Sequence, residues 1–334
     1  MLRRLASSPW TRRVGFAAWT GGALACGYST RKADDEQRAR SLPSGFRACC
    51  ESSIELTPAQ LALKPKLVEI VGAANVHFSV DQKGARLGSG EAFALVKPGS
   101  LQQAVDALQA CVDADACVIP QGANTGLTGG SVPRGEALDR PTVVLNMTRL
   151  SSISPIDGGE RLVCLAGAGI YSALGKAAEL QRESHSVLGS LFLNPTVAAG
   201  VAFGSGGTQM RKGPVFTERV LFAYVDAAGR VQLEDTLGLK PTERAELFEK
   251  LERGTVSQDD VKTNCAHRAS NQLEYRHSLC QLDGAVSRCN ADTSGPPPCR
   301  SEGKVLILAS VHDTFPRPSR CATLWISCKV QRLL

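Results

Sequence analysis

A glycine-rich stretch from Pro120 to Ser131 restricts the fold of this chain more than any other feature of its sequence. It reads PQGANTGLTGGS and directly follows the short apolar run Ala116 to Ile119. Glycine permits positive φ angles and lets a ligand approach the main chain closely, and successive N–H groups in such a turn form a concave anion site. The pattern indicates a strand that ends in a phosphate-binding loop. An ordinary glycine-rich surface loop is the alternative.

The stretch differs from two familiar phosphate-binding motifs. A Walker loop ends in Gly-Lys-Ser or Gly-Lys-Thr, and no lysine occurs here. A dinucleotide-binding βαβ unit needs G-x-G-x-x-G leading into a helix, whereas Gly130 leads to Pro133 and a charged loop. The phosphate would therefore be bound by a loop of another kind.

A second cluster of small residues lies downstream, between Leu188 and Gly207. It contains eight glycines and alanines at close intervals: Gly189, Ala198, Ala199, Gly200, Ala202, Gly204, Gly206 and Gly207. Two such clusters with strands between them suggest one elongated ligand that lies against the backbone along its length. A dinucleotide such as FAD has that shape. Tight packing between elements also selects small residues and is the alternative explanation.

The residues from about Glu91 to Val231 resemble the FAD-binding domain of the respiratory, quinone-reducing D-lactate dehydrogenases, flavoproteins of the vanillyl-alcohol-oxidase type. The matching motifs are VKPGS from Val96, QGANTGLT from Gln121, RESHSVLGS from Arg182, GSGG from Gly204 and RKGPVFTE from Arg211. A weaker match ends at Phe315. The resemblance implies an α/β (α+β) fold in which two small mixed sheets with flanking helices form the FAD-binding domain.

The resemblance also implies which residues bind the flavin. The cofactor contacts that it assigns are Gly122, Ala123, Asn124, Thr125, Gly126, Gly130, Ser131, Gly189, Thr196, Gly206 and Ile307. The loop from Gln121 to Ser131 contains no histidine or cysteine, so we expect FAD to be held without a covalent bond. The chain departs from the family at Phe203-Gly204, where relatives carry two asparagines, and the Phe203 ring could pack against the flavin instead.

By this resemblance the chain would oxidise D-lactate, or a related 2-hydroxy acid, to the 2-oxo acid and pass the electrons to a quinone. An inactive FAD-binding fragment and a flavin oxidase with another substrate are the alternatives. We assign no catalytic residue, because the family's candidates for the general base lie in a capping domain that has no match here. His185 is the only histidine inside a matched motif, and a packing role is the favoured interpretation.

Four segments are expected along the chain. Residues 1–40 form a targeting presequence, 55–315 the FAD-binding domain, 256–300 an irregular insertion within it, and 316–334 an unmatched tail. The tail begins where the resemblance stops, which suggests a truncated form. Within the domain, Thr57 and Pro58 are typical of a helix start, and apolar periodicity predicts helices that begin at Leu101 and Ile170. A charged surface helix is expected from Thr242. Strands are expected at 92–96, 117–120, 142–147, 161–166, 219–225, 230–233 and 304–311.

The first thirty residues are rich in arginine and serine and contain no acidic residue. This composition is typical of a mitochondrial presequence. A secretory signal and an inner-membrane anchor after import are the alternatives, since the apolar run Val14 to Tyr28 is short for a bilayer span. The net charge of +6 is accompanied by no basic face or motif, so no nucleic-acid partner is expected.

The twelve cysteines form no C-x-x-C pair. We interpret most of them as reduced and buried, because free thiols behave as small apolar groups. Cys265 and Cys280 lie near His267 and His277, but their spacing fits no zinc template. No metal site is therefore assigned.

Overall fold

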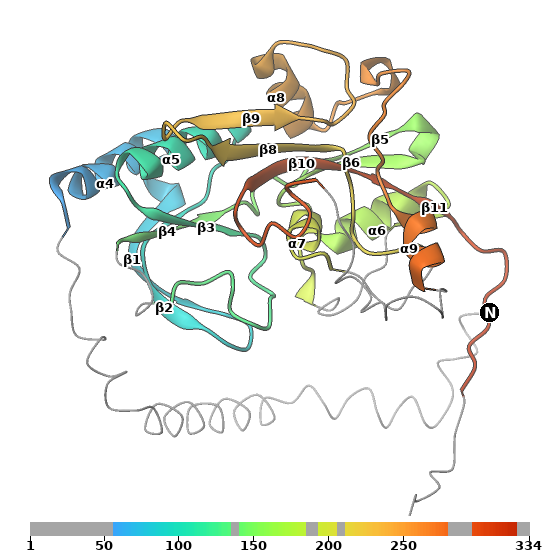
Figure 1. Ribbon diagram of the computed structural model, residues 1–334, viewed down its shortest axis with the longest axis horizontal. Helices are drawn as coiled ribbons and strands as arrows, with labels where there is room; N and C mark the ends of the chain where they lie inside the picture. The colour runs from blue at the N-terminus through green and yellow to red at the C-terminus, as the bar shows by residue number, and fades with distance from the viewer. Residues whose placement is uncertain (1–55, 135–139, 185–192, 206–210, 280–295, 326–334) are drawn as a thin grey trace, which may run out of the picture. The chain divides into compact units, whose positions relative to one another are not determined.

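The structure is a computed structural model, and it describes residues 56–134, 140–184, 193–205, 211–279 and 296–325 (Figure 1). All of them belong to the unit Ile54–Leu334. Two sheets with helices around them make up this unit, which confirms the predicted fold class. The first sheet mixes parallel and antiparallel strands as expected, whereas the second was expected to be mixed and is antiparallel throughout.

The first sheet has four strands in the order β1-β2-β4-β3. Its elements are α4 (Pro58–Val71), β1 (Val76–Lys83), β2 (Ser89–Val96), α5 (Leu101–Asp113), β3 (Cys117–Gln121) and β4 (Thr142–Asn146), with the short helix η3 (Ala73–Asn75) before β1. The strands β2, β4 and β3 run parallel, and β1 is antiparallel to β2. The glycine-rich loop therefore begins directly at the carboxyl end of β3.

The helix ends follow local signals in the sequence. Thr57 forms a capping box with Gln60, and Pro58 is the first helical residue of α4. Ser100 accepts a hydrogen bond from the Gln103 N–H at the start of α5. Both starts agree with the predicted ones, because each cap depends on residues within one turn of the chain.

The second sheet has five strands in the order β5-β6-β10-β8-β9. Its strands are β5 (Ile153–Ile156), β6 (Arg161–Leu165), β8 (Val220–Val225), β9 (Val231–Asp235) and β10 (Leu306–Asp313), and β7 (Arg182–Glu183) pairs separately with β11 (Phe315–Pro316). The accompanying helices are η4 (Asp157–Gly159), α6 (Ile170–Glu179), α7 (Val197–Ala202), α8 (Arg244–Arg253), η6 (Gln258–Asp260) and α9 (Gln272–Leu279). The predicted hairpin is confirmed as β8 and β9. Two short helices, η6 and α9, lie in the stretch expected to be irregular.

One hydrophobic core joins the two sheets. Helix α5 packs against β3 and β4 on one side and against β9 and α8 on the other (Figure 1). Gln109 of α5 fixes this contact, because its side chain donates to the Gly229 carbonyl at 3.0 Å and accepts from the Val231 N–H at 2.8 Å. The central strand β10 is buried over almost its whole length.

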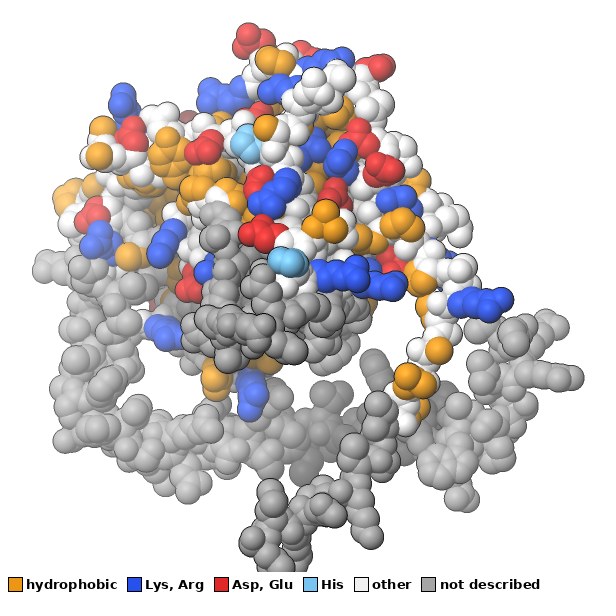
Figure 2. Space-filling model, turned by 45° about the vertical axis from the view of Figure 1, so that its right-hand side comes forward, with side chains coloured by type: hydrophobic (Ala, Val, Ile, Leu, Met, Phe, Trp, Pro, Cys, Tyr) orange, Lys and Arg blue, Asp and Glu red, His pale blue; other side chains and the backbone are white. Residues whose placement is uncertain are grey.

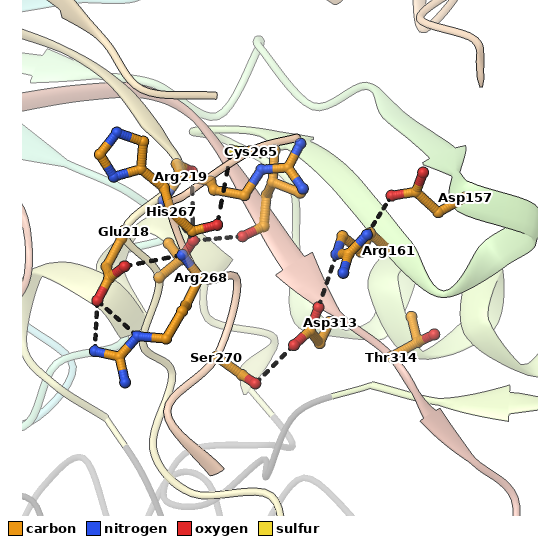
Figure 3. A network of polar contacts seen from close by, with 12 residues as sticks. Asp157, Arg161, Glu218, Arg219, Cys265, His267, Arg268, Ser270, Asp313 and Thr314 are labelled. Carbon is orange, nitrogen blue, oxygen red and sulfur yellow. Dashed lines mark hydrogen bonds and ion pairs between the residues drawn. The ribbon is translucent and has the colours of Figure 1, made fainter. Parts of the chain in front are cut away.

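A polar network closes the end of the second sheet where β10 finishes (Figure 3). Arg161 contacts Asp157 at 2.5 Å and Asp313 at 3.1 Å, and the Ser270 hydroxyl donates to Asp313 at 2.7 Å. Charges of both signs also lie side by side elsewhere on the surface, and Figure 2 shows acidic and basic side chains interspersed over the face drawn there.

Replacement of Asp157 by asparagine is expected to destabilise the protein by about 1 kcal/mol near pH 6, after allowance for solvent screening. Burial alone would raise the pKa of Asp157, but hydrogen bonds from Arg161 and Gln258 outweigh it and leave the pKa below its ordinary value. A carboxylate with a lowered pKa stabilises the folded state above the pKa of the unfolded chain, and this stabilisation is lost as the pH falls through the folded value. Urea unfolding measures the difference.

The difference between the wild type and Asp157→Asn should therefore shrink towards zero below about pH 3. Asp81→Asn, on the exposed strand β1, is the control and should change little at either pH. A destabilisation by Asp157→Asn that persists unchanged in acid would contradict an ionic role for this carboxylate.

Candidate functional site

A cavity of about 390 Å³ lies where the glycine-rich loop, α7 and the start of β10 meet. Its size is within the ~300–1,000 Å³ typical of small-molecule sites. The lining includes every residue from Gln121 to Gly126, residues of α7, and Leu306 and Ile307 of β10. Two stretches that are far apart in the sequence therefore share one crevice.

Side chains of the loop hold its shape. Gln121 donates to the Ser131 carbonyl at 2.7 Å, which ties the two ends of the loop together. The Ser131 hydroxyl donates to the Asn124 side chain at 2.7 Å, and Asn124 donates in turn to the Lys83 carbonyl at 2.8 Å. Asn124 has a φ of 53°, a left-handed conformation that asparagine tolerates better than most residues. The loop is thus preorganised by its own polar groups.

The base of the loop is fixed by a buried amide. Asn146, at the end of β4, donates to the Gln121 side chain at 2.7 Å and to the Gly122 carbonyl at 3.1 Å. Its side-chain oxygen accepts from the Thr148 N–H at 3.2 Å. All of its hydrogen-bonding groups are therefore engaged, as a buried amide requires. Asn146 couples the first sheet to the loop that lines the cavity.

Helix α7 forms the opposite wall. Thr196 is its N-cap and accepts from the Ala199 N–H at 3.3 Å. A Cβ added to Gly122 would collide with the Thr196 hydroxyl, so the loop and the helix touch at a point that only glycine allows. Helix α7 packs in turn against β10 (Figure 1). The contact between Gly122 and Thr196 brings the two small-residue clusters together.

The cavity contains nine of the eleven predicted cofactor-binding residues. They are Gly122, Ala123, Asn124, Thr125, Gly126, Gly130, Ser131, Thr196 and Ile307. Gly189 and Gly206, and also His185, lie outside the described residues. The shared location agrees with a common ligand, and the individual contacts with FAD stay predictions.

Other lining residues were not assigned from the sequence. Met147 and Val215 are buried beside the cavity, and Glu302 and Gly303 enter it from the turn before β10. Val215 lies in the matched motif RKGPVFTE but was not assigned to the site, and the local sequence around Met147, Glu302 and Gly303 gives no signal, because only the tertiary structure brings these residues to the cavity. Phe203 also lines the cavity, with 51% of its surface exposed and its ring 3.7 Å from the position of a Gly130 Cβ.

Two other kinds of feature are absent from the described residues. Over these residues, no helix is both long and apolar enough to cross a membrane. In the same part of the chain, no three His, Cys, Asp or Glu side chains come together as potential ligands of a metal ion.

Comparisons with known proteins place this geometry in a family context. Residues 92–232 match the family model described as FAD binding domain. A quinone-dependent D-lactate dehydrogenase of Corynebacterium glutamicum is 39% identical over 242 residues, which are 70% of this chain and 41% of the relative. The enzymes of the same name are 32% identical in Haemophilus influenzae (78% of this chain, 47% of the relative) and 35% identical in Escherichia coli (70% and 41%). The chain spans less than half the length of these relatives.

Solved structures with the same fold are more distant in sequence. Two crystal forms of alkyldihydroxyacetonephosphate synthase superpose with TM-scores of 0.51 and 0.50 at 14% identity. The first match covers 80% of this chain and 42% of the synthase, and the second covers 81% and 46%. At this identity the similarity concerns the fold alone.

The residues around the cavity fit the chemistry of FAD. The main-chain N–H groups of Ala123 and Gly126 donate to no protein acceptor within the described residues, so both remain available to phosphate oxygens. The loop carries no acidic side chain that would repel a pyrophosphate. Elsewhere the lining is mainly apolar, with Val118, Val215 and Ile307 among its members, as a flavin ring requires.

Proposed function

We propose that this protein takes part in the oxidation of D-lactate or a related 2-hydroxy acid. Its residues 92–232 match the FAD binding domain family. The product would be the 2-oxo acid, and a quinone would accept the electrons. The relationship to three quinone-dependent D-lactate dehydrogenases supports the choice of substrate and acceptor. The single observation that carries the proposal is the crevice shared by the glycine-rich loop and α7.

In this proposal the chain binds and orients the cofactor. Free amides of the loop bind the phosphates, while Gln121, Asn146 and Ser131 keep the loop in its binding shape. Apolar residues such as Ile307 exclude water from the inner wall. When bound, FAD supplies the redox chemistry by accepting a hydride equivalent from a 2-hydroxy acid. We assign the general base to no residue of this chain.

A spectroscopic experiment tests the proposal. The full chain is refolded or expressed with excess FAD, desalted, and examined for the visible absorption of bound flavin. D-lactate is then added without oxygen, with L-lactate as the control. We expect flavin to be retained and to be bleached by D-lactate faster than by L-lactate. A colourless protein would contradict FAD binding, and a coloured protein that neither isomer bleaches would contradict the dehydrogenase activity.

A second candidate function is an FAD-binding fragment without turnover. The chain spans 41–47% of the length of these relatives, and no general base is assigned among its residues. The same experiment separates the two candidates. Retained flavin that stays oxidised with D-lactate supports the fragment.

We also propose that the protein is mitochondrial and contacts the inner membrane peripherally. The basis is the arginine-rich, acid-free composition of the first thirty residues. A fusion of residues 1–40 to a fluorescent protein should co-localise with a mitochondrial marker, and carbonate extraction should release the full chain from membranes. A cytosolic fusion, or a chain that resists extraction, would contradict the respective parts of this proposal.

A further inference from the structure

Arg219 is a buried cation whose charge is only partly compensated. It precedes β8, and only 2% of its surface is exposed. Its Nε donates to the Leu237 carbonyl at 2.6 Å, but one terminal nitrogen, Nη2, has no hydrogen-bond partner. A buried charged group without full hydrogen bonding is unfavourable. This nitrogen therefore has the capacity to bind an anion.

The nearby carboxylates do not fill this role. Asp157 and Asp313 both form ion pairs with Arg161, and neither makes a hydrogen bond to Arg219. Figure 3 shows Arg219 on the side of the network that lies towards Cys265 and His267. The segment that carries Cys265 and His267 therefore lies beside the guanidinium of Arg219.

Cys265 lies close to the unpartnered nitrogen of Arg219. The position that a Gly238 Cβ would occupy lies 2.5 Å from Cys265 Sγ and 2.9 Å from Arg219 Nη2, so the sulfur and the nitrogen flank the same point. As a thiol, Cys265 donates weakly to the His267 carbonyl at 3.7 Å. Burial lowers the pKa of Arg219, and the strongest opposing influence is the negative charge that Cys265 carries when it is ionised.

We propose that Cys265 is a reactive thiol that peroxides oxidise to sulfenic acid, with Arg219 stabilising the anionic sulfur. Reactive cysteines occupy electropositive, partly exposed surroundings, and Cys265 is partly exposed beside a buried guanidinium. The terminal nitrogen of Arg219 that has no hydrogen-bond partner can donate to the anionic sulfur.

The oxidation needs only a peroxide as co-reactant. The thiolate sulfur attacks one peroxide oxygen, and an S–O bond forms as the O–O bond breaks. The departing hydroxide takes a proton from solvent and becomes water. Sulfur is oxidised by two electrons and the peroxide is reduced by two, which leaves a sulfenic acid. No bound flavin is required, so the site is independent of the proposed dehydrogenase function.

The other described cysteines provide a contrast. Burial raises the pKa of Cys111 and of Cys164 to about 12, so both stay protonated and unreactive at neutral pH. Burial also raises the pKa of Cys299. Of the described cysteines only Cys111 and Cys164 are buried, so the expectation that most cysteines are buried is not met there. Cys117, Cys265 and Cys299 are partly exposed, and Cys321 is exposed. Cys321 therefore serves as an internal reference.

The test treats the full chain with hydrogen peroxide in the presence of dimedone, which traps sulfenic acids, and maps the adducts by mass spectrometry. In the folded wild type we expect Cys265 to be labelled at least ~10-fold faster than Cys321, although it is less exposed. In urea the two rates should become equal. Labelling of Cys265 in the folded protein that is no faster than labelling of Cys321 would overturn the proposal.

Two variants examine the role of Arg219. Arg219→Met should lower the labelling rate of Cys265 at least ~10-fold, whereas Arg219→Lys should retain part of it because the positive charge remains. Thermal melting followed by circular dichroism confirms that each variant is folded. A folded Arg219→Met protein with an unchanged Cys265 rate would overturn the role of the guanidinium. If this variant does not fold, the comparison in the wild type decides.

Discussion

Gly126→Val is expected to weaken FAD binding at least ~100-fold, which corresponds to about 2.7 kcal/mol. Gly126 lines the cavity, and a Cβ added there meets no protein atom within 4 Å. Its φ is also outside the left-handed region, so the backbone accepts a side chain. The added isopropyl group would therefore fit the FAD-free protein but occupy space beside the amides that we propose to bind phosphate.

Binding and folding can be separated at this position. The melting temperature of the FAD-free Gly126→Val protein should stay within ~2 °C of the wild type, because surface substitutions usually change stability by less than ~0.5 kcal/mol. Titration with FAD, followed by flavin fluorescence, measures the affinity. Gly175→Val is the matched control, since its added Cβ also meets no atom within 4 Å but lies on α6, away from the cavity. Equal affinities of the two variants would contradict the assignment of the loop.

Local signals account for the parts of the fold that the sequence predicts well. Capping residues specify the starts of α4 and α5, and the apolar stripe of α5 matches its buried face. The strongly apolar β10 is also predicted, although it begins at Leu306 rather than at Lys304. In each case the determining residues are neighbours in sequence, so no knowledge of the tertiary structure is needed.

The elements that the sequence does not reveal depend on distant partners. Strand β1 alternates weakly and is exposed on one face, and β5 contains Pro155, which is unfavourable except at an edge. Both are edge strands held by pairing with β2 and β6. Helix α7 lies within a cluster of alanine and glycine and is not predicted from the sequence. It forms because Thr196 caps it and because Gly200 lets it pack closely against Val215.

The residues of the candidate site likewise fall into those that the local sequence indicates and those that depend on distant partners. The loop residues from Gly122 to Ser131 are recognisable by composition, and the family resemblance adds Thr196 and Ile307. Met147 and Glu302 are not recognisable, because they reach the cavity only through the turns that follow β4 and precede β10. The polar residues that support the loop, such as Asn146, give no signal in sequence beyond their position at a strand end. Their role depends on hydrogen bonds between separate segments.

The turn after β6 is the point where the two sheets and α7 are joined. Gly167 donates to the Leu150 carbonyl at 2.7 Å, and the neighbouring Ala166 donates to the Leu308 carbonyl of β10 at 2.9 Å. The Ala168 carbonyl accepts from the Val197 N–H at the start of α7, also at 2.9 Å. Three segments are therefore fixed to this turn through their main chains, which leaves little freedom for adjustment.

Gly167→Ala is accordingly expected to destabilise the protein by about 3 kcal/mol or more, the upper range for overpacking. The added Cβ would collide with the Met147 carbonyl oxygen and lie 2.7 Å from the Leu150 carbonyl oxygen and 2.8 Å from Thr148 Cα. All three contacts are with backbone, so no side-chain rotation can relieve them. The melting temperature of the FAD-free protein should fall by roughly 6–12 °C.

Gly175→Ala is the control for this substitution. It lies within α6 and has open space around the added Cβ, so it should be neutral or stabilise the helix by up to about 1 kcal/mol. Since Met147 and Ala166 also line the cavity, a displaced turn at Gly167 should weaken FAD binding as well. A Gly167→Ala protein with the melting temperature of the wild type would contradict the close packing of Gly167 against the backbone of Met147, Thr148 and Leu150.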